Sequence, residues 1–244
     1  MIIAQEMTEI GSEISRVEES IDRMCCAYGA QRADVFATTS NIIVSVEDEQ
    51  GVVITQTRRI KQRISNNMEK LHQYNALVRW ITETAPDEAT LDEHLAVARF
   101  SKTNPVWLVV LSNSFITASF CLFFGSRTYQ DCLVALIVGA TTGILSEILE
   151  RCKLNPIMIR FVCAFTASLI ALVSIGIGFI KTPEYVLIGN IMTLIPGVGL
   201  TNAMRDLFAG DVFSGILRSI EAVLFTLAIA FGMMLPNLLF GGMM

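Results

Sequence analysis

The sequence predicts an α-helical polytopic membrane protein with five spans and a small N-terminal cytosolic α+β domain. Two observations support this fold class. Hydrophobic residues make up 52% of the 244-residue chain, and five long apolar stretches follow one another after residue 104. The charge is also uneven, since residues 1–104 hold 27 of the 41 charged residues. The two parts of the chain therefore suit different solvents, and we expect a cytosolic domain at 1–104 and a transmembrane domain at 105–244.

The N-terminal domain is predicted to contain a helix, a three-stranded antiparallel meander and further helices. Apolar residues spaced by three and four predict the first helix over 7–28, with Gly29 ending it. Alternating apolar residues predict three strands, at 34–39, 42–47 and 52–60. Gly51 lies in the second hairpin loop, where a positive φ is expected. Helical periodicity resumes near Ser65, and a last short helix is expected at about 88–100.

The C-terminal domain is predicted to cross the bilayer five times. A span needs about 20 apolar residues, and the predicted spans are about 105–125, 131–149, 156–180, 185–200 and 212–240. Lys and Arg are alternately frequent and rare in the segments between them, which predicts a cytosolic N-terminus and a C-terminus outside. The first residues lack the basic and apolar regions of a signal peptide, which agrees with a cytosolic N-terminal domain.

The fourth predicted span is interrupted by a proline and several glycines. Pro196 removes a backbone donor and opposes the carbonyl four residues earlier. Broken helices of this kind often form solute sites in transporters, although a kinked helix that only packs closely is the alternative. A short interfacial helix with Thr201 as its N-cap is expected next. The candidate residues of a transport path are Asn190, Thr193, Pro196, Gly197, Gly199, Asn202, Arg205 and Asp206.

Two carboxylates near span ends are candidates for coupling transport to an ion. Glu147 lies at the end of the second span, and Glu221 lies one turn from Arg218, with which it could pair. Carboxylates inside a membrane are functional candidates by default, but side chains this near the cytosolic ends could instead reach the interface. No catalytic, nucleotide-binding or metal-binding motif is found, and no basic run suggests nucleic acid. We therefore expect no enzyme activity, cofactor, metal or nucleic-acid partner.

Several sequence blocks resemble the threonine/serine exporter (ThrE-type) family. Residues 11–18 match the G-x-E-x-x-R-V-E signature that opens this family. The blocks Leu194-Ile195-Pro196-Gly197 and Asn202-Ala203-Met204-Arg205-Asp206-Leu207 give the strongest match. The signature and a further block at 57–60 contribute the candidate cytosolic-domain residues Glu13, Arg16, Glu18, Arg58 and Arg59.

The resemblance implies export of small hydrophilic metabolites across a bacterial cytoplasmic (inner) membrane. Full-length members of the family carry a second membrane half, which does not follow the five spans here. The chain thus resembles the larger member of a split pair, with a small integral membrane protein as its partner and a homo-oligomer as a further option. Threonine and serine are the solutes that the fused members imply, and dicarboxylates such as succinate are those of some split relatives.

Two other functions compete with export. A membrane-anchored sensor or scaffold would use the spans only as an anchor, but an anchor has no need of the break at Pro196. A membrane enzyme would use a carboxylate such as Glu13 or Glu18, although a polar helix face explains these acids more simply. Export by a two-component transporter is the function that the sequence favours.

Overall fold

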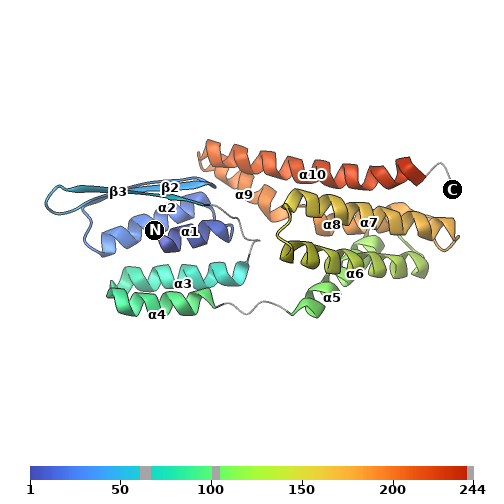
Figure 1. The fold of residues 1–244 in the computed structure, drawn as a ribbon, viewed down its shortest axis with the longest axis horizontal. Coiled ribbons are helices and arrows are strands. Elements are labelled where there is room, and N and C mark those ends of the chain that lie inside the picture. Colours follow the sequence, from blue (N-terminus) through green and yellow to red (C-terminus); the bar gives the residue numbers. More distant parts are fainter. Residues whose placement is uncertain (61–66, 101–104, 241–244) are drawn as a thin grey trace. The chain divides into compact units, whose positions relative to one another are not determined.

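The computed structural model describes residues 1–60, 67–100 and 105–240, and the chain divides into two compact units (Figure 1). The first unit comprises Met1–Lys102 and Leu200–Ser219, and the second comprises Thr103–Gly199 and Ile220–Met244. The predicted domain boundary at residue 104 and the predicted helix start near Ser65 lie outside the described residues.

The N-terminal part of the first unit consists of helices and one three-stranded antiparallel sheet, as predicted. Its elements are α1 (Ile2–Glu9), α2 (Ile14–Ala27), β1 (Arg32–Ala37), β2 (Asn41–Glu47), β3 (Val53–Arg59), α3 (Met68–Thr84) and α4 (Glu88–Arg99). The strands pair in the order β1-β2-β3. Gly29 and Gly51 have φ angles of 85° and 77°, which confirms the predicted helix end and hairpin loop.

The single helix predicted over 7–28 is wrong, because the chain forms two helices there. Gly11 has a φ of 87° between α1 and α2, a backbone conformation that side chains with a Cβ disfavour. The apolar residues on the two sides of Gly11 keep helical spacing, so periodicity alone could not reveal this break. Both helices still bury their apolar sides in one core.

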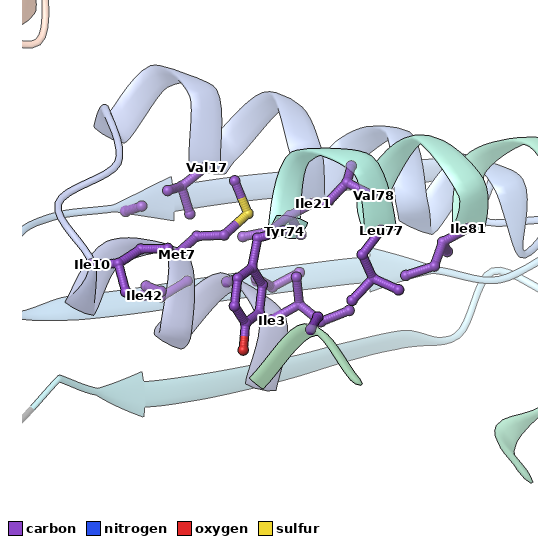
Figure 2. Close-up of a cluster of buried hydrophobic side chains, with 14 of the residues drawn as sticks. Ile3, Met7, Ile10, Val17, Ile21, Ile42, Tyr74, Leu77, Val78 and Ile81 are labelled. Carbon is purple, nitrogen blue, oxygen red and sulfur yellow. The ribbon is translucent and has the colours of Figure 1, made fainter. Parts of the chain in front are cut away.

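The core of this unit lies between the helices and one face of the sheet (Figure 2). Met7 of α1, Val17 of α2, Ile42 of β2 and Ile81 of α3 are each no more than 1% exposed. Tyr74 of α3 is also buried, and a polar network satisfies its hydroxyl group. Burial of apolar surface contributes about 25 cal/mol per Å² to folding. The apolar side chains that the helices and the sheet bury together therefore hold the helices to the sheet.

The polar network at the edge of this core joins three helices. The Tyr74 hydroxyl donates a hydrogen bond to the Glu6 carboxylate of α1, and Arg99 of α4 forms an ion pair with the same carboxylate at 2.6 Å. Burial and the hydrogen bond to Glu6 raise the pKa of Tyr74, so the phenol remains a donor at neutral pH. Glu6 therefore fixes α3 and α4 against α1.

The remaining helices supply the predicted membrane spans. They are α5 (Val106–Phe123), α6 (Tyr129–Arg151), α7 (Pro156–Gly176), α8 (Pro183–Leu194), α9 (Gly197–Phe208) and α10 (Val212–Phe240). In the described part of the chain, four of them are long and apolar enough to cross a membrane, and α8 and α9 form a pair bent by 52° that can act as a fifth span. The break falls at Pro196, as predicted. Helix α9 begins at Gly197, so the predicted N-cap at Thr201 is wrong.

Glycines let the helices of the second unit approach one another closely. A Cβ atom on Gly189 of α8 would lie 2.5 Å from the backbone oxygen of Thr117 in α5, and one on Gly139 of α6 would lie 2.7 Å from Ser114 Cα. A Cβ atom on Gly232 of α10 would lie 2.5 Å from the backbone oxygen of Phe161 in α7. Gly139, inside the predicted second span, thus allows close packing of α6 against α5.

We predict that Gly189→Ala destabilises the second unit, because the added methyl group meets rigid backbone. Overpacking of this kind costs about 1–3 kcal/mol, which should lower the thermal unfolding midpoint of the purified protein in detergent by several degrees. Gly197→Ala is the matched control, since a Cβ there meets nothing within 4 Å. Equal midpoints for the two variants would contradict the close crossing of α5 and α8.

Candidate functional site

A chain of polar side chains crosses three helices of the second unit. Asn113 of α5 donates from Nδ2 to the Gly139 carbonyl at 2.8 Å and to Thr142 Oγ1 of α6 at 3.2 Å. Thr142 Oγ1 lies 3.1 Å from Oδ1 of Asn190 in α8. Thr142 and Asn190 are fully buried. These hydrogen bonds link α5, α6 and α8 inside the bundle.

The side-chain amide of Asn190 is satisfied on one side only. Its Nδ2 atom has no hydrogen-bond partner among the described residues. A buried polar group without a partner costs about 1–3 kcal/mol. Such a cost is typical of a functional position that a solute or water completes.

A cavity of about 340 Å³ lies beside this polar chain. Its polar lining comes from Ser112, Asn113, Thr142, Ser146, Arg160 and Thr193. The first four belong to α5 and α6, Arg160 belongs to α7, and Thr193 belongs to α8 immediately before the break at Pro196. The cavity thus lies at the end of the bundle where α5 and α7 begin and where α6 and α8 end. Its size and mixed lining suit a small polar solute.

Arg160 alone carries a charge among the described residues that line this cavity. It is half-buried, and its guanidinium carbon lies 5.9 Å from the ring centre of Phe225 in α10. A cation over an aromatic face at this distance gains about 0.5–2 kcal/mol. This contact positions the arginine, while its donors remain suited to a carboxylate.

A second polar cluster lies in the first unit, around the second half of the broken span. Asp206 of α9 and Arg218 of α10 form an ion pair at 3.1 Å, and their side chains are only 1% and 2% exposed. Arg218 Nη2 also donates to the Ser12 carbonyl, between α1 and α2, at 2.8 Å. Removing one member of a buried ion pair leaves an uncompensated charge, so Asp206 and Arg218 depend on each other.

A further ion pair and a tight helix contact support this cluster. Arg205 of α9 binds Glu13, the residue before α2, with an exposed arginine side chain. A Cβ on Gly215 of α10 would lie 2.6 Å from Leu207 Cγ of α9. The turn between α9 and α10 is therefore packed tightly, and its charges join it to the α1–α2 turn.

The family comparison covers almost the whole chain. The family model described as "Putative threonine/serine exporter" (ThrE) matches residues 1–237. The chain belongs to the ThrE family. This is a family of membrane transporters rather than of enzymes, which agrees with the four to five candidate spans.

Two similar proteins carry the same description. The chain is 26% identical over 236 residues to "Probable succinate transporter subunit YjjP" of Klebsiella aerogenes (strain ATCC 13048), covering 95% of this chain and 88% of the relative. It is also 26% identical over 236 residues to the Escherichia coli (strain K12) protein of that description, covering 95% and 89%. No solved structure gave a significant match to the chain.

The predicted transport-path residues fall into two groups in this exporter-family fold. Asn190 and Thr193 lie at or beside the cavity, and Pro196, Gly197 and Gly199 lie at the break or at the start of α9. These five belong to the second unit. Asn202, Arg205 and Asp206 belong to the first unit, where Asp206 and Arg205 form ion pairs.

The two predicted coupling carboxylates lie in different helices of the second unit. Glu147, near the end of α6, forms an ion pair with Arg151 at 3.1 Å. Glu221 of α10 is half-buried. Arg218 forms a buried ion pair with Asp206, and its predicted pairing with Glu221 stays a prediction. Ion coupling through either carboxylate stays a prediction.

The five predicted residues of the N-terminal motif make separate contacts. Glu13 binds Arg205, and Arg16 Nε donates to Asn75 Oδ1 at 3.0 Å. Glu18 accepts a hydrogen bond from the Ala37 backbone at 2.8 Å, which joins α2 to β1.

Burial raises the pKa of the Glu18 carboxyl, and the hydrogen bond from the Ala37 backbone N–H opposes that rise. Arg58 Nε donates to Gln5 Oε1 at 3.0 Å, and Arg59 is exposed at the end of β3. These contacts connect elements of the domain to one another rather than forming one pocket.

Sequence reasoning missed three residues that the structure places at these sites. Arg160 is the fifth residue of α7 and lies inside the predicted third span. Arg218 likewise lies inside the predicted fifth span. Thr142 lies inside the predicted second span, where a single hydroxyl group gives no distinct signal. Position inside a predicted span was the available signal for both arginines.

We predict that Asp206→Asn lowers the free energy of unfolding of the first unit by about 3–5 kcal/mol, because the buried Arg218 then loses the carboxylate of its ion pair with Asp206. The measurement is the thermal or denaturant midpoint of the purified full-length chain. Glu13→Gln is the matched control. It removes a carboxylate from an arginine that is 62% exposed, and exposed pairs contribute about 0–1 kcal/mol.

The double variant Asp206→Leu, Arg218→Met should recover most of the stability lost in Asp206→Asn, because it removes both charges at once. A double variant as unstable as the single one would show that packing rather than the ion pair holds α9 and α10 together.

Proposed function

We propose that this protein is one subunit of a two-component exporter of small hydrophilic metabolites, with the cavity bounded by α5, α6, α7 and α8 as part of the solute path. The half-satisfied amide of Asn190, next to a cavity lined by hydroxyl and amide groups, is the observation that carries this proposal. An anchor or scaffold has no use for an unsatisfied polar group in a bundle, because lipid offers no partner to it.

The position of the cavity agrees with a role in export. It lies at the end of the bundle where α5 and α7 begin, and the distribution of Lys and Arg predicts that this end faces the cytosol. An exporter takes up its solute from the cytosol. A cavity open toward that side would receive the solute, and the break at Pro196 next to Thr193 would let the wall of the cavity change shape.

A membrane partner is part of the proposal. The two curated relatives are described as transporter subunits, and the chain supplies at most five spans in its described part. We propose that a small integral membrane protein completes the path in the bacterial cytoplasmic membrane. The N-terminal domain would then lie in the cytosol.

Two solute classes compete for this path. Threonine and serine each carry one carboxylate, which matches Arg160, the single charged residue among the described lining residues. Their hydroxyl and ammonium groups match the hydroxyl groups of Ser112, Ser146 and Thr193 in the lining. Succinate carries two carboxylates and would need a second cation, which the partner or a second copy would have to supply. The description of the relatives supports succinate. The geometry of this chain favours the threonine/serine class.

We predict that cells expressing the chain with its membrane partner release threonine or serine faster than cells expressing either protein alone. The measurement is the concentration of threonine, serine and succinate in the medium after loading the cells with each solute. Selective release of succinate would favour the dicarboxylate alternative. No release of any of the three would overturn the proposed function.

We also predict that Thr142→Val lowers this export between about fivefold and a hundredfold. Valine keeps the shape of threonine but removes the hydroxyl that links Asn113 to Asn190, so buried amides lose partners at a cost of about 1–3 kcal/mol. Thr141→Val is the matched control at the adjacent position, because the Thr141 hydroxyl binds only the Ile137 carbonyl of its own helix among the described contacts. Equal export by both variants would place the solute elsewhere.

A further inference from the structure

Building on the proposed function, we propose that Arg160 is the residue that binds a carboxylate of the exported solute. The cavity would thus be a binding site for small organic acids, with Arg160 at one side and the polar chain of Asn113, Thr142 and Asn190 at the other. This assignment concerns the chemistry that the path recognises, whereas the proposed function concerns transport itself.

Arg160 lies inside a predicted span and is only half-buried, so its charge is open to a partner in the cavity. An arginine within a membrane span is costly unless it faces a polar cavity or a partner. Among the described arginines after residue 104, Arg151, Arg205 and Arg218 have carboxylates of this chain at ion-pair distance. No such carboxylate is found for Arg160 within the described residues, although it lines the cavity. The space in front of it is where a solute carboxylate can lie.

The surroundings of Arg160 position its guanidinium group without occupying its donors. The ring of Phe225 holds the group from α10 at 5.9 Å, and an aromatic face makes no hydrogen bond to the guanidinium edge. Glu150, near the end of α6, interacts with Arg160 electrostatically but forms no ion pair with it among the described contacts. A planar guanidinium group with free donors matches a carboxylate in a bidentate geometry.

The rest of the lining indicates what the bound acid carries besides its carboxylate. Ser112, Ser146 and Thr193 offer hydroxyl groups, and Asn113 and Thr142 connect the cavity to the unsatisfied amide of Asn190. Hydroxyl and ammonium groups of a solute can replace the water that this lining would otherwise bind. The site therefore fits a small acid with a second hydrogen-bonding group a few atoms from its carboxylate.

The test uses the chain together with its membrane partner in proteoliposomes, with radiolabelled threonine and succinate as the two probes. For the transported probe, Arg160→Gln should raise the half-saturating concentration about 10- to 100-fold, since a hydrogen bond to a charged group contributes about 1.5–3 kcal/mol. The maximal rate should change much less. Arg160→Lys keeps the positive charge and should lie between Arg160→Gln and the wild type. Arg127→Gln, which removes an exposed arginine before α6, is the matched control and should behave as the wild type.

A second arm needs no variant. Threoninol lacks the threonine carboxylate, and succinamide lacks both carboxylates of succinate, so neither should compete with the transported probe in the wild-type protein. An unchanged half-saturating concentration in Arg160→Gln would overturn the assignment, as would competition by the uncharged analogue equal to that of the acid. Both results would leave export itself established, whereas a wild-type pair that transports neither probe would overturn the proposed function instead.

Discussion

The ion pair between Asp206 and Arg218 is the interaction on which the arrangement of the first unit depends. Both charges are withdrawn from water, and the attraction between them offsets part of the cost of burying each one. Arg218 also holds the backbone at Ser12, so the turn between α9 and α10 is tied to the turn between α1 and α2. The second half of the broken span therefore folds as part of the N-terminal unit and not as a separate surface helix.

A different constraint governs the second unit, where helix backbones meet through glycines. At Gly139, Gly189 and Gly232 there is no room even for a methyl group, so these crossings are fixed points of the bundle. The same helices also border a cavity, which serine, threonine and asparagine side chains line together with Arg160 and apolar residues. Close backbone contacts and an internal cavity are thus produced by the same few helices.

Much of the fold could be predicted because it follows from local patterns. Apolar length indicated the spans, alternation indicated the strands, and the position of Pro196 indicated the break in the fourth span. The sequence did not predict the split of the first helix at Gly11 or the start of α9 at Gly197, because helical periodicity continues through both positions. The ion pairs Asp206–Arg218 and Glu13–Arg205 could not be read from the sequence, since only the folded chain brings their partners together. Arg160 could not be assigned to the cavity from the sequence, because only the folded bundle places it beside the side chains of α5, α6 and α8.

The half-satisfied amide of Asn190 has a consequence for which small metabolites a cell retains. An exporter that released every small metabolite would drain its host, so it must reject compounds of nearly the same shape. A binding site whose polar groups lack hydrogen-bond partners discriminates strongly against an analogue without the matching group. Valine and threonine have almost the same volume, yet only threonine can complete such a network. Incomplete hydrogen bonding inside the bundle would then serve retention as much as release.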